Sequence, residues 1–130
     1  MQLNAPDYII LIVENLDRAL VFYTEVLGLK LGHRSGDYAQ LDTGKTRLAL
    51  YTRHAMASTL GMSLAAPSSE TPGFEIGFKV ANVDDAVREL LARGAKLAAA
   101  PADRFWGQRT AYVRDPDGHL IELAQALPRV

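Results

Sequence analysis

Hydrophobic and polar positions follow one order of predicted elements along the chain, and that order occurs twice. Residues 8–13 form a β-branched apolar run, which predicts a strand buried on both faces. Residues 16–27 carry apolar positions at helical spacing, which predicts a helix. Residues 29–51 are divided by two turns rich in Asp, Gly and Ser, which predicts three strands. The first module is therefore β-α-β-β-β over residues 6–53.

The second half repeats this order in a module over residues 74–126. A strand is expected at 74–80, followed by a helix whose apolar stripe includes Val83, Val87 and Leu90. Three further strands are expected at 96–100, 110–114 and 120–124. The last two are joined by Asp-Pro-Asp-Gly at 115–118, where proline at the second position and glycine at the fourth fit a type I turn.

The two modules also align residue by residue. A shift of 67 positions lays residues 13–19 on residues 80–86, so that Asn15 and Asn82 both fall where a helix N-cap belongs. Gly28 and Gly94 both fall where a left-handed C-cap belongs. Neither module can bury its apolar sheet face alone, so we expect one domain over residues 1–130 with a cavity between the modules. Residues 54–73 lose periodicity, which predicts an irregular linker.

Composition excludes several functions. The chain has 130 residues, a formal net charge of −1 and no basic stripe, which argues against binding nucleic acid. There are no cysteines, hence no disulfides, thiolate metal ligands or cysteine nucleophile. No basic segment leads into a long apolar run, so we expect neither a signal peptide nor a membrane span, and a cytoplasmic protein.

The paired modules, with Asn-Leu-Asp-Arg-Ala at 15–19, Phe-Tyr-x-x-Val-Leu-Gly-Leu at 22–29 and Asp-Pro-Asp-Gly-His-Leu-Ile-Glu-Leu at 115–123, resemble the vicinal oxygen chelate superfamily. That superfamily includes glyoxalase I, bleomycin-resistance proteins and extradiol dioxygenases. The resemblance implies an α+β fold of two tandem β-α-β-β-β modules with cupped mixed sheets. It does not determine the function, because the same scaffold carries isomerases, transferases, oxygenases and non-catalytic binders.

In catalytic members of that superfamily a divalent ion is held by the first and last strands of each module. The corresponding positions here are Tyr8, Ala49, Glu75 and Glu122. Alanine cannot coordinate and imidazole is missing from the set, so no standard metal centre is expected. Two carboxylates with water could still hold Mg²⁺ or Mn²⁺ weakly, which remains an open alternative. The three histidines, His33, His54 and His119, are expected to be exposed.

Five residues besides Ala49 and Tyr8 are candidates for the pocket. If Glu75 and Glu122 lie close together, burial and like charge should raise the pKa of at least one of them, and they suit either ligand recognition or acid–base chemistry. Trp106 and Arg109 belong to a six-residue segment that could stack on an aromatic ligand. Tyr112 lies on a predicted strand and either lines the cavity or completes the core.

Our leading hypothesis is therefore a small-molecule-binding protein similar to the bleomycin-resistance branch, which binds an aromatic and partly polar compound in the cavity between the modules without a standard metal centre. The alternative is a divalent-metal-dependent enzyme, such as a glyoxalase-like isomerase or lyase or a dioxygenase-type enzyme. The resemblance also implies a homodimer, in which the modules pair either within one chain or by exchange between two chains.

Overall fold

The computed structural model describes residues 1–2 and 5–129, which divide into two compact units of residues 1–67 and 68–130. Each unit contains a four-stranded mixed sheet and one long helix segment, so the fold is α+β, as the sequence predicts. No helix among the described residues combines the length and the apolarity needed to cross a membrane. That the two modules form a single domain stays a prediction.

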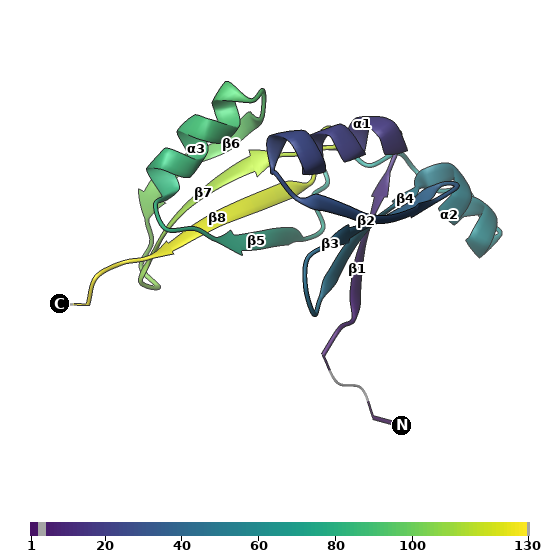
Figure 1. The fold of residues 1–130 in the computed structure, drawn as a ribbon, viewed down its shortest axis with the longest axis horizontal. Coiled ribbons are helices and arrows are strands. Elements are labelled where there is room, and N and C mark those ends of the chain that lie inside the picture. Colours follow the sequence, from purple (N-terminus) through teal and green to yellow (C-terminus); the bar gives the residue numbers. More distant parts are fainter. Residues whose placement is uncertain (3–4, 130) are drawn as a thin grey trace. The chain divides into compact units, whose positions relative to one another are not determined.

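Unit 1 contains strands β1 (Tyr8–Val13), β2 (Lys30–Ser35), β3 (Tyr38–Asp42) and β4 (Arg47–Thr52), in the order β1-β4-β3-β2. Strand β1 runs parallel to β4, and the other pairs are antiparallel. Helix α1 (Leu16–Val21) continues into the π-helix η1 (Phe22–Val26), and α1 packs on β3 and β4 (Figure 1). Helix α2 (Arg53–Leu60) follows β4 and contacts both β4 and β1.

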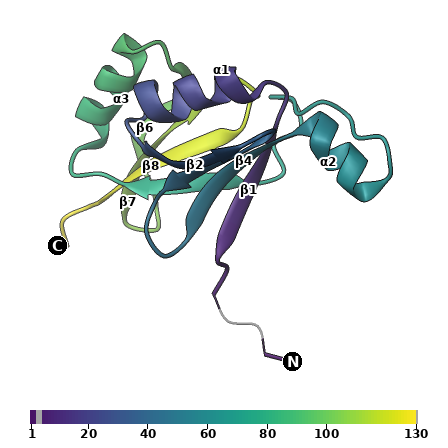
Figure 2. The same ribbon diagram turned by 45° about the vertical axis from the view of Figure 1, so that its right-hand side comes forward.

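Unit 2 repeats this topology with strands β5 (Glu75–Lys79), β6 (Lys96–Asp103), β7 (Gln108–Arg114) and β8 (Leu120–Ala126), in the order β5-β8-β7-β6. Strand β5 runs parallel to β8, and the other pairs are antiparallel. Helix α3 (Val83–Ala92) packs on β6, β7 and β8 (Figure 2). The equivalent parallel pairing in both units confirms the internal repeat.

The core of each unit lies between its sheet and its long helix, which is the continuous α1–η1 segment in unit 1 and α3 in unit 2. In unit 1 the strands contribute Leu11, Val13 and Leu50, which are at most 1% exposed. In unit 2 the corresponding side chains are Val113 and Ile121, both fully buried. Because strand side chains alternate, every second residue points to the opposite sheet face. We call that opposite face the distal face of each unit.

The predicted caps are confirmed in both modules. The side chain of Asn15 accepts a hydrogen bond from the amide of Arg18 at 2.9 Å, and Asn82 accepts one from Asp85 at 2.9 Å. Gly94 has a φ of +96° just after helix α3, in the left-handed region that glycine tolerates. The type I turn is also confirmed, because the amide of Gly118 donates to the carbonyl of Asp115 at 3.0 Å.

Three sequence expectations need correction. The helix expected over 16–27 changes to π-helical hydrogen bonding at Phe22, where Thr24 Oγ1 bonds back to the carbonyl of Leu20 at 2.7 Å. Strand β1 is not buried on both faces, since Tyr8 and Ile10 on its distal side are half-exposed. Strand β6 extends to Asp103 rather than ending at residue 100.

The segment 54–73 is not wholly irregular, because helix α2 occupies its first part. Thr52 caps this helix by accepting a hydrogen bond from the amide of Ala55 at 3.2 Å, and Gly61 ends it with a φ of +69°. None of its residues is buried. An apolar stripe is therefore missing from the sequence, and the helix is specified by its caps instead.

Candidate functional site

The distal face of unit 2 carries two carboxyl groups side by side. Strand β5 pairs Gly77 with Glu122 of β8, and β7 pairs Tyr112 with the same Glu122, so these three residues form one row across the sheet. The Tyr112 hydroxyl donates to Glu122 Oε2 at 2.8 Å. Glu75 lies two residues before Gly77 on the same strand face. The structure therefore brings together Glu75, Tyr112 and Glu122 from the predicted site residues.

Gly77 provides the space that the Glu122 carboxylate occupies. A Cβ atom at position 77 would lie 3.0 Å from Glu122 Oε1, which is closer than an ordinary van der Waals contact. Any larger residue here would force the carboxylate to move. Gly77 is therefore part of the site, although sequence reasoning missed it. The available signal was a glycine inside an otherwise apolar strand, which marks a close approach of other atoms.

Burial and like charge act together on these groups. Partial loss of hydration raises the pKa of Glu75, and the negative charge of Glu122 and a hydrogen bond to it raise that pKa further. Burial likewise raises the pKa of Tyr112, and its hydrogen bond to Glu122 adds to the effect, whereas Thr110 opposes it. The pair therefore favours a state in which Glu75 keeps its proton more readily than a solvated glutamate.

A cation borders this pair without contacting it. Arg104 donates through Nε to the hydroxyl of Thr110 at 2.8 Å, and its guanidinium carbon lies 5.9 Å from the centre of the Tyr112 ring. Thr110 is fully buried, which fixes the arginine at this point of the sheet. The guanidinium thus contacts an aromatic face, at a distance that suits a cation–π interaction.

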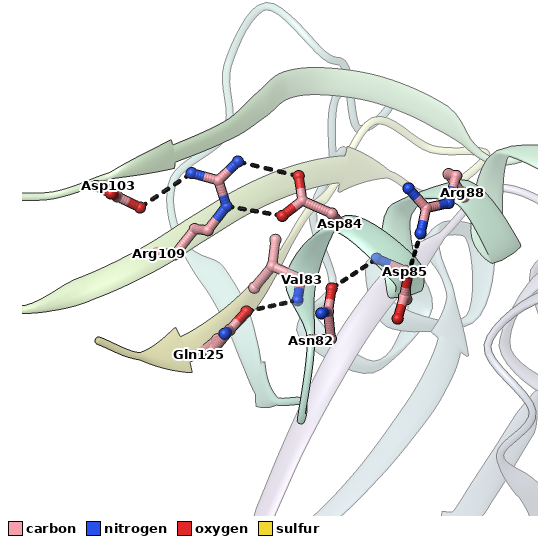
Figure 3. A network of polar contacts seen from close by, with 8 residues as sticks. All are labelled: Asn82, Val83, Asp84, Asp85, Arg88, Asp103, Arg109 and Gln125. Atoms are coloured by element: carbon pink, nitrogen blue, oxygen red, sulfur yellow. Dashed lines mark hydrogen bonds and ion pairs between the residues drawn. The ribbon is translucent and has the colours of Figure 1, made fainter. Parts of the chain in front are cut away.

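Arg109 lies on the helix-covered face rather than beside the carboxyl pair. Figure 3 shows its guanidinium bonded to both oxygens of Asp84 on α3, at 2.9 and 3.0 Å, and to Asp103 at 2.9 Å. These bonds lower the pKa of Asp84. Gln125 accepts a hydrogen bond from the amide of Val83 in the same region, at 2.8 Å. The structure therefore places Arg109 where it joins α3 to the sheet.

Trp106 belongs to the turn between β6 and β7. It is half-exposed, and its indole Nε1 donates to Gln108 Oε1 at 3.0 Å. The neighbouring Phe105 is almost fully exposed and packs edge-to-face on the indole with ring centres 5.0 Å apart. The ligand-binding role predicted for Trp106 stays a prediction.

The equivalent row in unit 1 has different chemistry. Ile10, Ala49 and Gln40 are paired across β1, β4 and β3, in the positions that Gly77, Glu122 and Tyr112 occupy in unit 2. No carboxylate is present in this row. Tyr8 lies at the start of β1, where the guanidinium carbon of Arg47 is 6.0 Å from its ring centre.

Beside this row, unit 1 has an apolar pocket with a volume of about 400 Å³. Tyr38 and Tyr51 pack edge-to-face in it, with ring centres 6.3 Å apart. The remaining walls come from strand β1 and from helix α2. The lining residues are Ile10, Ile12, Tyr38, Tyr51 and Met56. The size is that of a site for a small organic molecule. Sequence reasoning missed the pocket, because Met56 belongs to the unpredicted helix.

The two units have the same topology, so the chain is a duplicated β-α-β-β-β protein. The chain belongs to the Glyoxalase/Bleomycin resistance protein/Dioxygenase superfamily, whose family model matches residues 5–123.

The chain is also similar to individual proteins. The chain is 34% identical over 121 residues to the uncharacterized protein YraH of Bacillus subtilis, which covers 90% of this chain and 94% of that protein. A glyoxalase/bleomycin resistance protein/dioxygenase from Nocardioides has a TM-score of 0.86 at 24% identity, covering 100% of this chain and 88% of the other. TnmS3, an antibiotic binding protein from Streptomyces sp. CB03234, has a TM-score of 0.72 at 23% identity, covering 97% and 98%.

The family positions for a metal do not fit a standard centre here. In unit 1 they hold Tyr8 and Ala49, and the alanine has no donor atom. In unit 2 they hold Glu75 and Glu122, with Glu122 already accepting a hydrogen bond from Tyr112. Zinc, nickel or iron sites with imidazole ligands therefore have no counterpart at these four positions.

A separate group of potential ligands lies at the β7–β8 turn. Ligand atoms of Asp115, Asp117 and His119 lie within 4.8 Å of one another. Asp115 already accepts hydrogen bonds from the amides of Asp117 and His119, at 2.9 and 2.8 Å, and bonds to the His119 ring at 2.7 Å. These contacts account for the turn itself. His119 is thus partly buried rather than exposed, whereas His33 and His54 are exposed as expected.

Proposed function

We propose that this protein binds a small aromatic and partly polar compound, in the manner of the bleomycin-resistance branch, without a standard metal centre. The apolar pocket of unit 1 carries the proposal. It is lined by two aromatic rings, two isoleucines and a methionine, and its volume of about 400 Å³ suits a molecule of drug size. Apolar burial against these side chains would supply most of the binding free energy.

The distal faces of the two units differ in chemistry. The distal face of unit 1 offers apolar surface, whereas that of unit 2 offers Glu75, Glu122 and Tyr112 for hydrogen bonds. The antibiotic binding described for TnmS3 is compatible with this proposal. A homodimer remains our prediction for the assembly, and sedimentation velocity measures it directly.

Neighbouring isoleucines of β1 provide a matched test. Ile10 lines the pocket, whereas Ile9 points to the other face with similar exposure, 36% against 45%. The fluorescence of 8-anilinonaphthalene-1-sulfonate, titrated with protein, measures occupation of apolar sites. Ile10→Glu should weaken binding about tenfold, because about 1.4 kcal/mol of apolar contact is lost. Ile9→Glu should change binding less than about twofold. Equal effects of both variants would contradict the proposed site.

The alternative function is a divalent-metal-dependent enzyme such as a glyoxalase-like lyase or isomerase. The juxtaposition of Glu75 and Glu122 favours it, since Mg²⁺ and Mn²⁺ accept oxygen ligands. Elemental analysis of protein purified without chelator, with thermal shift in a series of divalent ions, distinguishes the two functions. A stoichiometric ion that is lost in Glu122→Ala and retained in Ile10→Glu would favour the metal-dependent enzyme over the metal-free ligand-binding protein.

A further inference from the structure

The polar groups of the unit 1 pocket are already engaged inside the protein. Thr59 Oγ1 donates to the carbonyl of Ala55 at 2.9 Å, so its proton is used within helix α2. The Tyr51 hydroxyl lies 3.0 Å from the same Oγ1 and must therefore be the donor to it. The Tyr38 hydroxyl donates to Gln40 Oε1 at 3.0 Å. Both tyrosines thus present ring surface, with their protons directed away from a ligand.

Gln40 does not line this pocket itself, but it bonds to Tyr38, which does. Its side chain lies on the distal face, two residues along β3 from Tyr38, where it pairs with Ala49. Because Oε1 accepts the Tyr38 proton, the amide is oriented and its Nε2 keeps two hydrogens for donation. Within residues 1–2 and 5–129 the structure records no partner for Nε2.

We infer that this pocket takes a neutral ring compound that carries an acceptor oxygen, such as a ketone or quinone, with Gln40 Nε2 donating to that oxygen. This inference rests on the proposed function and specifies its ligand. None of the five lining residues is charged, so a cationic amine would lose its hydration without gaining a carboxylate partner.

Three compounds with one carbon frame test the inference. Tetralin has no polar group, 1-tetralone adds a ketone, and 1-aminotetralin adds a cationic amine. Dissociation constants come from backbone amide shifts in NMR titrations of the full chain, which also locate the binding site. One neutral hydrogen bond of about 0.5–1.5 kcal/mol makes 1-tetralone bind about two- to tenfold more tightly than tetralin. The amine should bind more weakly than both.

Variants of Gln40 identify the donor. Gln40→Leu should remove the preference for 1-tetralone over tetralin, and Gln40→Glu should reverse that preference at neutral pH. Tyr38→Phe frees Oε1 and should reduce the preference, because the amide loses its fixed orientation. This variant keeps the ring, so it separates orientation from packing.

The outcomes separate this inference from the proposed function. Equal binding of tetralin and 1-tetralone, or tightest binding of the amine, overturns the acceptor-oxygen ligand and leaves the apolar pocket in place. A preference that survives in Gln40→Leu overturns the role of Gln40. No shifts at Ile10, Ile12 and Met56 with any of the three compounds overturns the proposed function as well.

Discussion

Gly77→Ala tests whether the glycine makes room for Glu122. The new Cβ would lie 3.0 Å from Glu122 Oε1, so the carboxylate must move by a few tenths of an ångström. That movement weakens the 2.8 Å hydrogen bond from Tyr112, which we expect to cost about 1–2 kcal/mol. Alanine in place of glycine offsets this by about 0.5–1 kcal/mol, because it reduces the entropy of the unfolded chain. The net loss should be about 1 kcal/mol.

A double-mutant cycle with Tyr112→Phe isolates the cause. When the tyrosine hydroxyl is absent, the carboxylate can move freely, so Gly77→Ala should become neutral or stabilise by about 0.5 kcal/mol. Urea unfolding followed by the fluorescence of Trp106 reports on unit 2, because this is the only tryptophan of the chain. Gly73→Ala, with open space around the added methyl, measures the backbone effect alone. The same loss from Gly77→Ala with and without the hydroxyl would refute the reasoning.

Three further predictions concern unit 2. Folding raises the pKa of Glu75, so the wild type should be less stable than Glu75→Gln at pH 7. As the pH falls through the raised pKa, the stability of the wild type should approach that of the variant. Parallel profiles of stability against pH, measured by urea unfolding, would contradict this. Gly118→Ala should lower the free energy of unfolding by more than about 2 kcal/mol, since φ is +90° and the new Cβ would lie 2.4 Å from the amide nitrogen of Ser69. A variant with wild-type thermal stability would refute the close contact. Asp84→Asn should destabilise unit 2 at pH 7, and the deficit should disappear as the pH falls through the lowered pKa of Asp84, which thermal melts at several pH values would detect.

Controls for the last two predictions are present in the chain. Gly36 has a φ of +57° with open space around an added methyl, so Gly36→Ala measures the backbone cost without the clash. Asp85→Asn removes the exposed pair with Arg88 on the same helix turn, and it should matter less than Asp84→Asn. Persistence of the Asp84→Asn deficit in acid would show that the Arg109 bonds are not its cause.

The elements that sequence predicts well are those set by local chemistry. Asn15 and Asn82 have the side-chain oxygen that an N-cap requires, and the turn at 115–118 follows from one proline and one glycine. Helix α2 escaped prediction because its residues are not buried and so leave no apolar pattern. The π-helical turn escaped it because the bond from Thr24 to Leu20 competes with regular helical bonding, which residue type alone does not reveal.

Some contacts of the candidate site also follow from the local sequence, whereas others do not. The secure register of the β7–β8 hairpin places Glu122 and Tyr112 opposite each other, so their contact follows from strand alternation. The same alternation puts Arg109 on the other face, three residues from Tyr112. Gly77 is different, because its importance depends on which strand pairs with its own. That pairing joins residues about 45 positions apart in unit 2 and is not encoded in any short segment.

The separation of each sheet into a helix-covered face and a distal face has an evolutionary consequence. Substitutions at Leu50 or Ile121 disturb a packed interior, whereas the row of Ile10, Ala49 and Gln40 has diverged completely from Gly77, Glu122 and Tyr112 while both copies retained one topology. Substitutions on the distal face can therefore change the chemistry of that face without loss of folding. A scaffold organised in this way is readily recruited to new chemistry after gene duplication.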